Sequence, residues 1–396
     1  MLNNKIDFSN SIFNDIVDFT GAIFYNFSID FSNCLFKDIV KLEGSKFYGG
    51  VNSNLYFNDS IFEKKIIFDY SKFYNFFLIN YKNAQFLDET SFYETKFKIN
   101  KGNYSILDFS EAIIHKDIIF RYCDFQDTVL FNNTIFYGNI DMYSAKIGKK
   151  IVFFNTEISN EINFDNIIFK NKNTILSINN DKFQKINKIN FENIIIDGRI
   201  NIQNISVNII DFSGTIINLG LFITVNFKVH KFANRESALF LKNEAYARNN
   251  AIDALQYKAQ EVELHKDELI KKSNKTYKDW ADIFSIGLSS LYSDNGQNWI
   301  KALFMTIFIT ALCFTVFYIP DLTDSNIIRI YYRNLFPELI KYFIPTDYSL
   351  IIKYAASKLN LFLKIFGVLV YFLGKILFWY GSVQTVQAFR KFAKGA

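Results

Sequence analysis

The stretch FSEAIIHKDIIFRYCDFQDTVLFNNTIF, residues 109–136, places large apolar residues at alternating steps of five and six. The pattern continues to residue 169, so the repeating unit is eleven residues long. Its apolar positions are Phe109, Ile114, Phe120, Phe125, Phe131, Phe136, Met142, Ile147, Phe153, Ile158, Phe164 and Phe169. A fixed period over so many units is typical of a repeat architecture.

A small residue stands two positions before the second large apolar residue of each unit. These small positions are Ala112, Cys123, Thr134, Ala145 and Thr156. The units are rich in Asn and Asp, which favour turns, and in Ile, Phe and Thr, which favour strands. The pattern therefore favours short strands joined by tight turns over a helical supercoil of the same period. Because a very short strand cannot bury its face alone, the strands are predicted to stack as a β-solenoid.

The segments FRYCDF (120–125), FNNTIF (131–136) and FDYSKF (68–73) resemble the F-x-x-A-x-F variant of the pentapeptide-repeat family. This resemblance implies an all-β fold, a right-handed parallel β-helix with four sides, in which the large apolar and small residues point inward. Cys34 and Cys123 hold the small position, so we expect them to pack in the core, whereas Asp127 is expected on an outward turn. The pattern fades near Val229, so residues 1–230 are predicted as the β-helix.

Charge is divided unevenly along the chain. Residues 1–230 carry 23 basic and 25 acidic side chains, and residues 231–396 carry 21 and 14, for a formal net charge of +5. Some pentapeptide-repeat proteins resemble duplex DNA and inhibit topoisomerases, a role that requires a strongly acidic surface. The balanced repeat half argues against that role, and we expect no nucleic-acid partner.

Residues that carry catalytic chemistry are sparse. His115, His230 and His265 lie far apart, and no cysteine or carboxylate cluster has the spacing of metal ligands. The sequence contains no glycine-rich phosphate loop, no G-x-S-x-G motif and no H-E-x-x-H motif. We therefore expect a protein that is not an enzyme, with no catalytic residue, no metal and no cofactor.

From Phe232 the pattern changes to that of helices. Asn234 is a candidate N-cap, and a second helix is expected from Ala251 to about Lys272. Residues 231–296 are predicted as a cap and linker, whose two antiparallel helices cover the open end of the β-helix. The segment NRESALFLKNEAYARNNAIDALQYKAQEVE (234–263) resembles a helical linker in pentapeptide-repeat proteins that continue into a membrane domain.

Two apolar runs follow, near residues 299–319 and 365–383, and residues 297–396 are predicted as a membrane domain. Both ends of this domain are expected in the cytoplasm, because basic residues precede the first run and follow the second. These are Lys271, Lys272, Lys275, Lys278, Arg390, Lys391 and Lys394. The connecting segment, residues 321–360, would face the exterior, lying on the outer leaflet or dipping into it. Trp299, Trp379 and Tyr380 are expected as anchors near the inner interface.

The second run carries the candidate functional residues. Gly367, Gly374 and Gly381 recur every seven residues, and such a stripe lets helix backbones pack closely in a membrane. Lys375 lies beside this stripe. A lysine within a span is costly, so it is either a functional charge lining a pore or a side chain that reaches past the end of a shorter span.

The segments LSSLYSDNGQNWIKALFMTIFIT (288–310) and WYGSVQTVQAFRKFAK (379–394) are similar to C-terminal, ion-channel-like domains of membrane-bound pentapeptide-repeat proteins. This resemblance implies a multi-pass protein of the bacterial inner membrane that forms homo-oligomers in the lipid bilayer. Its cytoplasmic β-helix would bind or sense an unknown protein partner, with an effector role in stress or phage response as one interpretation. The alternative is a membrane-anchored scaffold for protein–protein interaction without conductance.

Overall fold

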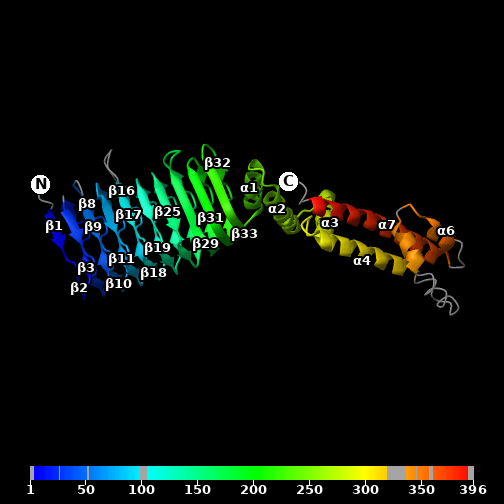
Figure 1. Ribbon diagram of the computed structural model, residues 1–396, viewed down its shortest axis with the longest axis horizontal. Coiled ribbons are helices and arrows are strands. Elements are labelled where there is room, and N and C mark those ends of the chain that lie inside the picture. The colour runs from blue at the N-terminus through cyan, green and yellow to red at the C-terminus, as the bar shows by residue number, and fades with distance from the viewer. Residues whose placement is uncertain are drawn as a thin grey trace. The chain divides into compact units, whose positions relative to one another are not determined.

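The computed structural model describes residues 4–25, 27–50, 53–98, 105–318, 336–344, 346–355 and 360–390. The chain divides into two compact units, Met1–Phe240 and Leu241–Ala396. The first is a parallel β-solenoid of about nine turns, and the second is helical, with two helices long and apolar enough to cross a membrane (Figure 1). The predicted fold class is therefore confirmed.

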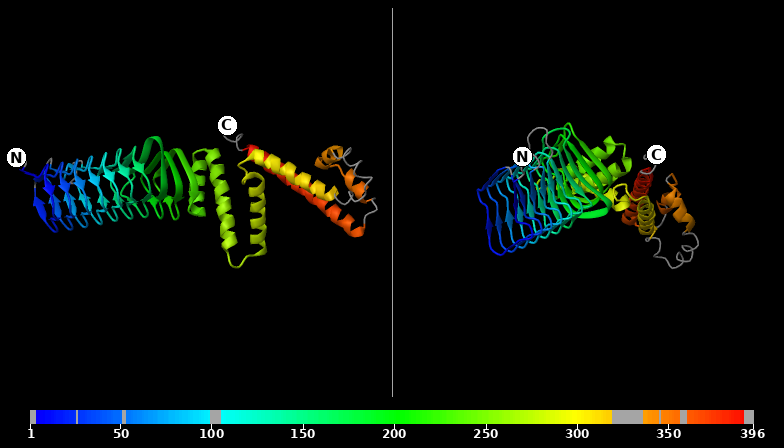
Figure 2. Two further views of the ribbon diagram at one scale, coloured as in Figure 1. Left: turned by 90° about the horizontal axis from the view of Figure 1, so that it is seen from below. Right: turned by 60° about the vertical axis from the view of Figure 1, so that its left-hand side comes forward.

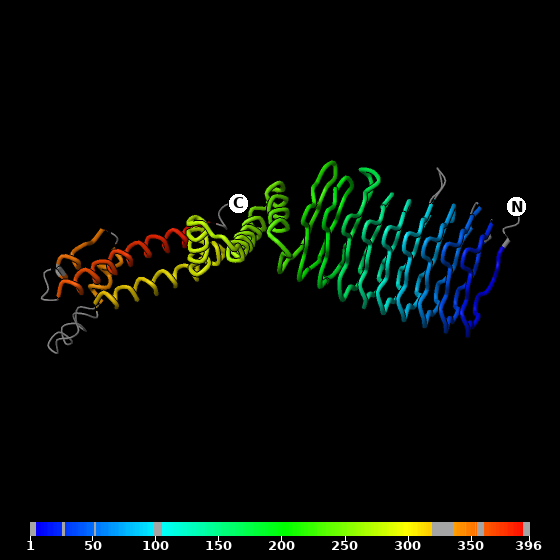
Figure 3. Tube along the Cα trace, turned by 180° about the vertical axis from the view of Figure 1, so that it is seen from behind, coloured from blue at the N-terminus to red at the C-terminus, as the bar shows by residue number. Residues whose placement is uncertain are grey.

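Each early coil of the solenoid adds one short strand to each of four parallel stacks, and Figure 3 shows the coils as successive layers. The first stack contains β1 (Asn4–Asp7), β5 (Phe27–Asp30), β9 (Asn54–Tyr56), β13 (Leu78–Asn80), β17 (Ile106–Asp108), β21 (Thr128–Leu130) and β25 (Lys150–Phe154). The second contains β2 (Ile12–Phe13), β6 (Leu35–Phe36), β10 (Ile61–Phe62), β14 (Gln85–Phe86), β18 (Ile113–Ile114), β22 (Ile135–Phe136) and β26 (Glu157–Ile158). The third contains β3 (Val17–Asp18), β7 (Val40–Lys41), β11 (Ile66–Ile67), β15 (Thr90–Ser91), β19 (Ile118–Ile119), β23 (Ile140–Asp141) and β27 (Glu161–Asn163). The fourth contains β4 (Ile23–Tyr25), β8 (Lys46–Tyr48), β12 (Lys72–Tyr74), β16 (Lys96–Lys98), β20 (Asp124–Phe125), β24 (Lys146–Ile147), β28 (Ile168–Phe169), β30 (Ile195–Ile196) and β32 (Ile216–Ile217).

The last coils use long strands in place of short ones. These are β29 (Ile175–Asn190), β31 (Arg199–Asp211) and β33 (Leu221–Phe232). One end of β29 pairs with β25 and the other with β27, so a single strand sweeps across faces that earlier coils build from separate strands. This change explains why the eleven-residue pattern lapses after Phe169, since a long strand needs no turn at each corner.

Register in the middle coils matches the period of the sequence. Ile114 pairs with Phe136, and Phe136 pairs with Ile158, each 22 residues further on, so one coil contains two eleven-residue units. The rings at one corner form a continuous column in which successive centroids lie 4.7 to 5.3 Å apart. That column contains Phe8, Phe31, Phe57, Tyr81, Phe109, Phe131 and Phe153. Stacked apolar burial of this kind is the main stabilising contribution in the solenoid.

The small positions point inward, as predicted. Cys34, Cys123 and Thr134 are buried, and the last two donate to backbone carbonyls of the preceding coil. The Cys123 thiol donates to the Phe92 carbonyl at 2.9 Å, and the Thr134 hydroxyl donates to the Phe109 carbonyl at 2.8 Å. Each of these carbonyls also accepts a backbone N–H of its own turn, from Thr95 at 3.0 Å and from Ala112 at 3.1 Å, so the inward side chain supplies a second donor to it.

The residue before each small position has a left-handed backbone. Asn33, Asn83 and Asn133 have φ values of 56°, 59° and 53°. The third residue of a type II turn requires a positive φ, and Asn tolerates it better than most residues. Several of these corners therefore have an Asn, which tolerates the left-handed backbone that the turn requires.

Asp127 corrects one expectation. It does not lie on a free outward turn, because its side chain is 8% exposed. Its carboxylate accepts from the backbone N–H of Ser105 at 3.0 Å and forms an ion pair with Lys149 at 2.9 Å. We therefore expect Asp127→Asn to weaken these contacts.

Helix α1 (Arg235–Ala247) begins where the solenoid ends. The Asn234 side chain accepts from the backbone N–H of Ser237 at 2.9 Å, which confirms the predicted N-cap. The ring of Phe240 stacks on Phe212 at 4.5 Å and extends the column of Phe164, Phe191 and Phe212. The first turns of α1 thus cover the apolar end of the coil.

The second unit contains α2 (Ala251–Lys271), α3 (Tyr277–Ser293), α4 (Trp299–Tyr318), α6 (Ser349–Ala355) and α7 (Leu361–Arg390), and residues 336–343 are also helical. Helix α2 ends one residue before the predicted Lys272. Helix α3 was not predicted; it begins at a capping box formed by Thr276 and Asp279, and it lies beside α2 (Figure 2). Helix α7 is longer than the predicted run of residues 365–383.

Candidate functional site

Helices α4 and α7 form an antiparallel pair. The ring of Trp299, at the start of α4, lies 5.8 Å from that of Phe389, near the end of α7. Each helix contains an 18-residue stretch with a mean hydropathy of 2.1, yet only 28% of that stretch in α4 and 22% of it in α7 is buried inside the protein. Helices in a soluble core would be covered, so these exposed apolar faces indicate two candidate membrane spans.

The glycine stripe of α7 packs against residues of its own chain. A Cβ at Gly374 would lie 2.8 Å from Cys313 Cβ of α4 and would overlap the Tyr342 hydroxyl. At Gly381 a Cβ would meet Thr306 of α4 and approach Tyr292 of α3 to 2.6 Å. At Gly367 it would overlap the ring of Tyr354 in α6. The three glycines therefore allow close approach of four other segments to α7.

Lys375 lies inside this packing and is 5% exposed. Its Nζ donates to the backbone carbonyls of Tyr342 and Ile344, both at 2.6 Å, and lies 5.1 Å and 5.3 Å from the ring centroids of Tyr342 and Tyr371. Tyr342 belongs to helix 336–343 and Ile344 follows it directly, so the ammonium group caps a helix C-terminus. Sequence reasoning marked Lys375 as unusual but could not identify these partners.

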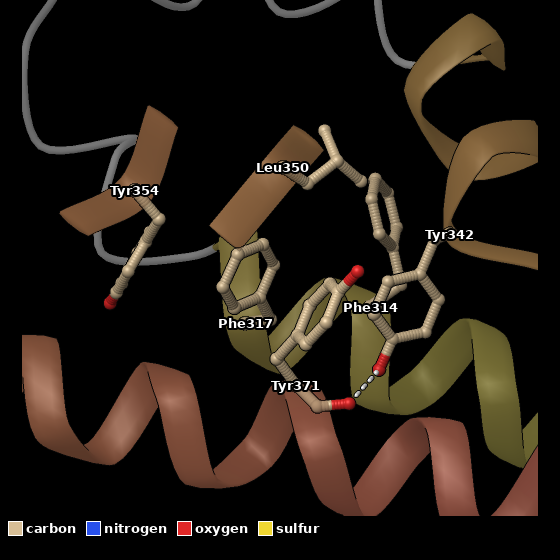
Figure 4. Packing of buried hydrophobic residues seen from close by; sticks show 6 residues of the cluster. All are labelled: Phe314, Phe317, Tyr342, Leu350, Tyr354 and Tyr371. Carbon is tan, nitrogen blue, oxygen red and sulfur yellow. Dashed lines mark hydrogen bonds between the residues drawn. The ribbon is translucent and has the colours of Figure 1, made fainter. Parts of the chain in front are cut away.

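A cluster of five aromatic residues and one leucine adjoins that lysine through Tyr342 and Tyr371. It contains Phe314, Phe317, Tyr342, Leu350, Tyr354 and Tyr371. Figure 4 shows these side chains between α4, α7 and the short helices of the connecting segment, with the Tyr342 hydroxyl donating to the Tyr371 carbonyl at 3.4 Å. The described parts of that segment therefore pack against the spans, and residues 321–335, 345 and 356–359 of the predicted exterior segment lie outside the described residues.

The candidate aromatic anchors do not share one level. Trp299 contacts Phe389, whereas Trp379 lies ten residues earlier on α7, about 15 Å along the helix at 1.5 Å per residue. Tyr380 packs edge-on against Tyr292 at 5.4 Å. Trp299 thus marks the end of the pair, while Trp379 is exposed on the side of the span and Tyr380 joins α3 to α7.

The outer surface of the pair is apolar. Every exposed residue of α7 from Leu361 to Val383 is apolar, and on α4 Thr315 is the one exposed polar residue among those described. The Thr315 hydroxyl donates to the Ala311 carbonyl at 2.9 Å, so it is satisfied within its helix. Such a surface suits contact with lipid tails.

A tyrosine ladder on the solenoid was missed by sequence reasoning. It consists of Tyr70, Tyr93, Tyr122 and Tyr143, whose rings meet edge to face at 5.5 to 5.6 Å. Tyr70 and Tyr122 are 54% and 42% exposed and have φ values of 60° and 58°. Elsewhere Asn often fills this left-handed position, so a bulky tyrosine there carries backbone strain that its packing role does not explain.

A groove of about 450 Å³ adjoins the ladder at Tyr93. Its lining includes Lys65 and Glu89, which form an ion pair at 3.1 Å, and the Asp69 carboxylate, which accepts from the Tyr93 backbone N–H at 3.0 Å. Arg121 completes the mixed-charge wall. Exposed Tyr and Arg beside a groove are the residue types that dominate protein–protein interfaces.

Among the residues described, no three His, Cys, Asp or Glu side chains gather in a group that could hold a metal ion. The expected absence of enzymatic activity, metal and cofactor stays a prediction. Comparison with family models, curated proteins and solved structures finds no match for this chain. The parallel coils are consistent with a pentapeptide-repeat-like β-helix, and the solenoid with its two candidate spans fits a membrane-anchored repeat protein.

Proposed function

We propose that this protein is a membrane-anchored scaffold, whose spans hold the solenoid at a bacterial inner membrane while the solenoid binds a protein partner in the cytoplasm. The observation that carries the anchor role is the exposed apolar surface of α4 and α7, on which Thr315 is the one exposed polar residue described between Trp299 and Val383. The tyrosine ladder and its groove support the binding role.

The channel-like interpretation stays a prediction, as does homo-oligomerisation. Two spans per chain can line a pore only in a ring of subunits, and selective pores are lined by carbonyls, charged side chains or other polar groups. Here the Lys375 amine and the buried hydroxyls of Thr306 and Thr310 bond to carbonyls within their own chain. A scaffold predicts no current from the purified protein in planar bilayers, whereas steady currents and a ring-sized mass in detergent would favour the channel.

The tyrosine ladder gives a test of partner binding. Tyr70→Asn with Tyr122→Asn should keep the fold, because Asn fills the same turn position at Asn33 and Asn83. Loss of two exposed interface tyrosines should weaken binding at least about tenfold, at roughly 1 kcal/mol or more each. We would measure the adduct formed in cells by a photo-crosslinker placed at Glu43 in the groove.

The matched control is Tyr25→Ala with Tyr48→Ala, a stacked tyrosine pair at 5.0 Å on β4 and β8. The partner adduct should persist in this control and disappear in the ladder variant. An adduct of unchanged yield in the ladder variant would exclude the ladder as the binding surface.

Topology can be tested with reporters. The lysines before α4 and the basic residues after α7 predict that both flanks of the span pair lie in the cytoplasm. A reporter that works only in the cytoplasm should be active when fused after Ala396 and inactive when inserted near Ser325. Activity at both positions would mean that one of the two helices does not cross the membrane.

A further inference from the structure

A cavity of about 600 Å³ lies inside the second unit, between α2, α3, the turn before α4 and the end of α7. Leu255 and Val262 of α2 and Ile286 of α3 give it apolar walls, and Gln384 and Gln387 of α7 give it polar ones. Its volume lies within the roughly 300–1,000 Å³ of typical ligand sites.

Two cations line this cavity without a counter-charge. Lys258 comes from α2 and Arg390 from α7, and no carboxylate is among the lining residues. Neither cation forms an ion pair within the described parts of the chain. The nearby Glu263 accepts from the Asn295 amide at 2.7 Å but is paired with Lys266. The cavity therefore carries an uncompensated positive charge and suits an anion.

The cavity lies at the end of the spans where α4 begins and α7 ends. On the last turns of α7, the exposed apolar residues Val383, Val386 and Phe389 alternate with the cavity residues Gln384, Gln387 and Arg390. Residues one position apart on a helix lie on adjacent faces, so the cavity adjoins the lipid-facing surface. Trp299 packs on Phe389 at this same level, where an interfacial tryptophan is expected.

We propose that this cavity binds the phosphate headgroup of an anionic phospholipid from the adjacent leaflet. The Arg390 guanidinium can hold two phosphate oxygens at once, Lys258 adds a point charge, and the glutamine amides donate to the remaining oxygens. The acyl chains would follow the apolar face of α7. Basic pockets at the cytoplasmic ends of spans are a known setting for such lipids. Because α2, α3 and α7 all contribute walls, an occupied site would also fasten the linker helices to the second span.

The proposal rests on the anchor role, so its test must be separable from that role. Lipid binding is measured by native mass spectrometry of the full chain in detergent, with phosphatidylglycerol and phosphatidylcholine added in turn. Membrane insertion is scored separately, by resistance to alkaline extraction. We expect about tenfold preference for phosphatidylglycerol in the parent protein. A chain that inserts but binds both lipids equally would overturn the lipid site in the cavity and leave the anchor role standing.

Charge variants locate the site. Lys258→Glu with Arg390→Glu should abolish the preference, and Lys258→Gln with Arg390→Gln should reduce it. Both residues are exposed, so these variants should keep the fold, as judged by unchanged lipid-free melting. The control is Lys172→Glu with Lys182→Glu, two exposed lysines of the solenoid. A preference that survives in the Lys258 and Arg390 variants, or that is lost in the control, would overturn the assignment.

A final arm separates a lipid from a soluble phosphate. Glycerophosphoglycerol, which is phosphatidylglycerol without its acyl chains, carries the same phosphodiester headgroup. It should compete with phosphatidylglycerol at least about a hundredfold less well than a second anionic lipid does. Equal competition would overturn the lipid source and assign the cavity to a free phosphate ligand.

Discussion

Cys123→Asp is expected to destabilise the solenoid by about 3 kcal/mol or more, enough to lower its melting temperature by many degrees. Cys123 is fully buried, and its thiol donates to the Phe92 carbonyl at 2.9 Å. An aspartate there would put a buried carboxylate against that carbonyl, and both groups are hydrogen-bond acceptors. Burial also raises the pKa of the Cys123 thiol well above its usual range, so this cysteine is a core residue and not a nucleophile.

Cys123→Ser is the matched control. Ser45, Ser60 and Ser71 hold the same position in other coils and are fully buried there. A serine at 123 keeps a donor for the Phe92 carbonyl, so its cost should stay near 1 kcal/mol. Both variants are compared with the parent by circular dichroism during heating of the full chain in detergent. Similar melting temperatures for the aspartate and serine variants would contradict the inward position of the small residues.

The solenoid could be predicted because the same spacing of large apolar and small residues recurs in many coils. Each coil needs a large apolar residue and a small one at a fixed spacing, so one ambiguous unit, such as that with Met142, does not obscure the rest. The pattern fails where the physical constraint changes. Along β29 a long strand crosses three faces without corner turns, and the period disappears from residues 170–188.

The partners of Lys375 could not be predicted. The Tyr342 and Ile344 carbonyls lie 33 and 31 residues away in the sequence and depend on the backbone of a short helix, which leaves no side-chain pattern. The spacing of Gly367, Gly374 and Gly381 did predict close helix packing, but not that Tyr342 and Tyr354 of the connecting segment fill two of the three gaps. Contacts between distant, non-repeating segments depend on how their side chains fit together in space. Such a fit leaves no periodic pattern in a single sequence.

Lys375→Glu is expected to release helix 336–343 from the spans. The new carboxylate would face the Tyr342 and Ile344 carbonyls, which now accept from Nζ at 2.6 Å, so three acceptors would meet without a donor. An unpaired buried acceptor costs about 1–3 kcal/mol, and the repulsion adds to this cost. Amide exchange over residues 336–344 should therefore accelerate at least about tenfold, since about 1.4 kcal/mol corresponds to a factor of ten.

Two further variants separate capping from a pore role. Lys341→Glu makes the same charge change, but it lies on helix 336–343 itself and breaks neither of the Lys375 hydrogen bonds. Amide exchange over residues 336–344 should therefore stay close to that of the parent. Lys375→Leu removes the donor without adding a charge and should give an intermediate acceleration. A pore-lining lysine predicts the opposite pattern, in which Lys375→Glu preserves protection of residues 336–344 and alters ion selectivity in planar bilayers. Observing that pattern would reject the capping role, because an ammonium group held by two carbonyls of its own chain has no charge-selective surface to present to passing ions.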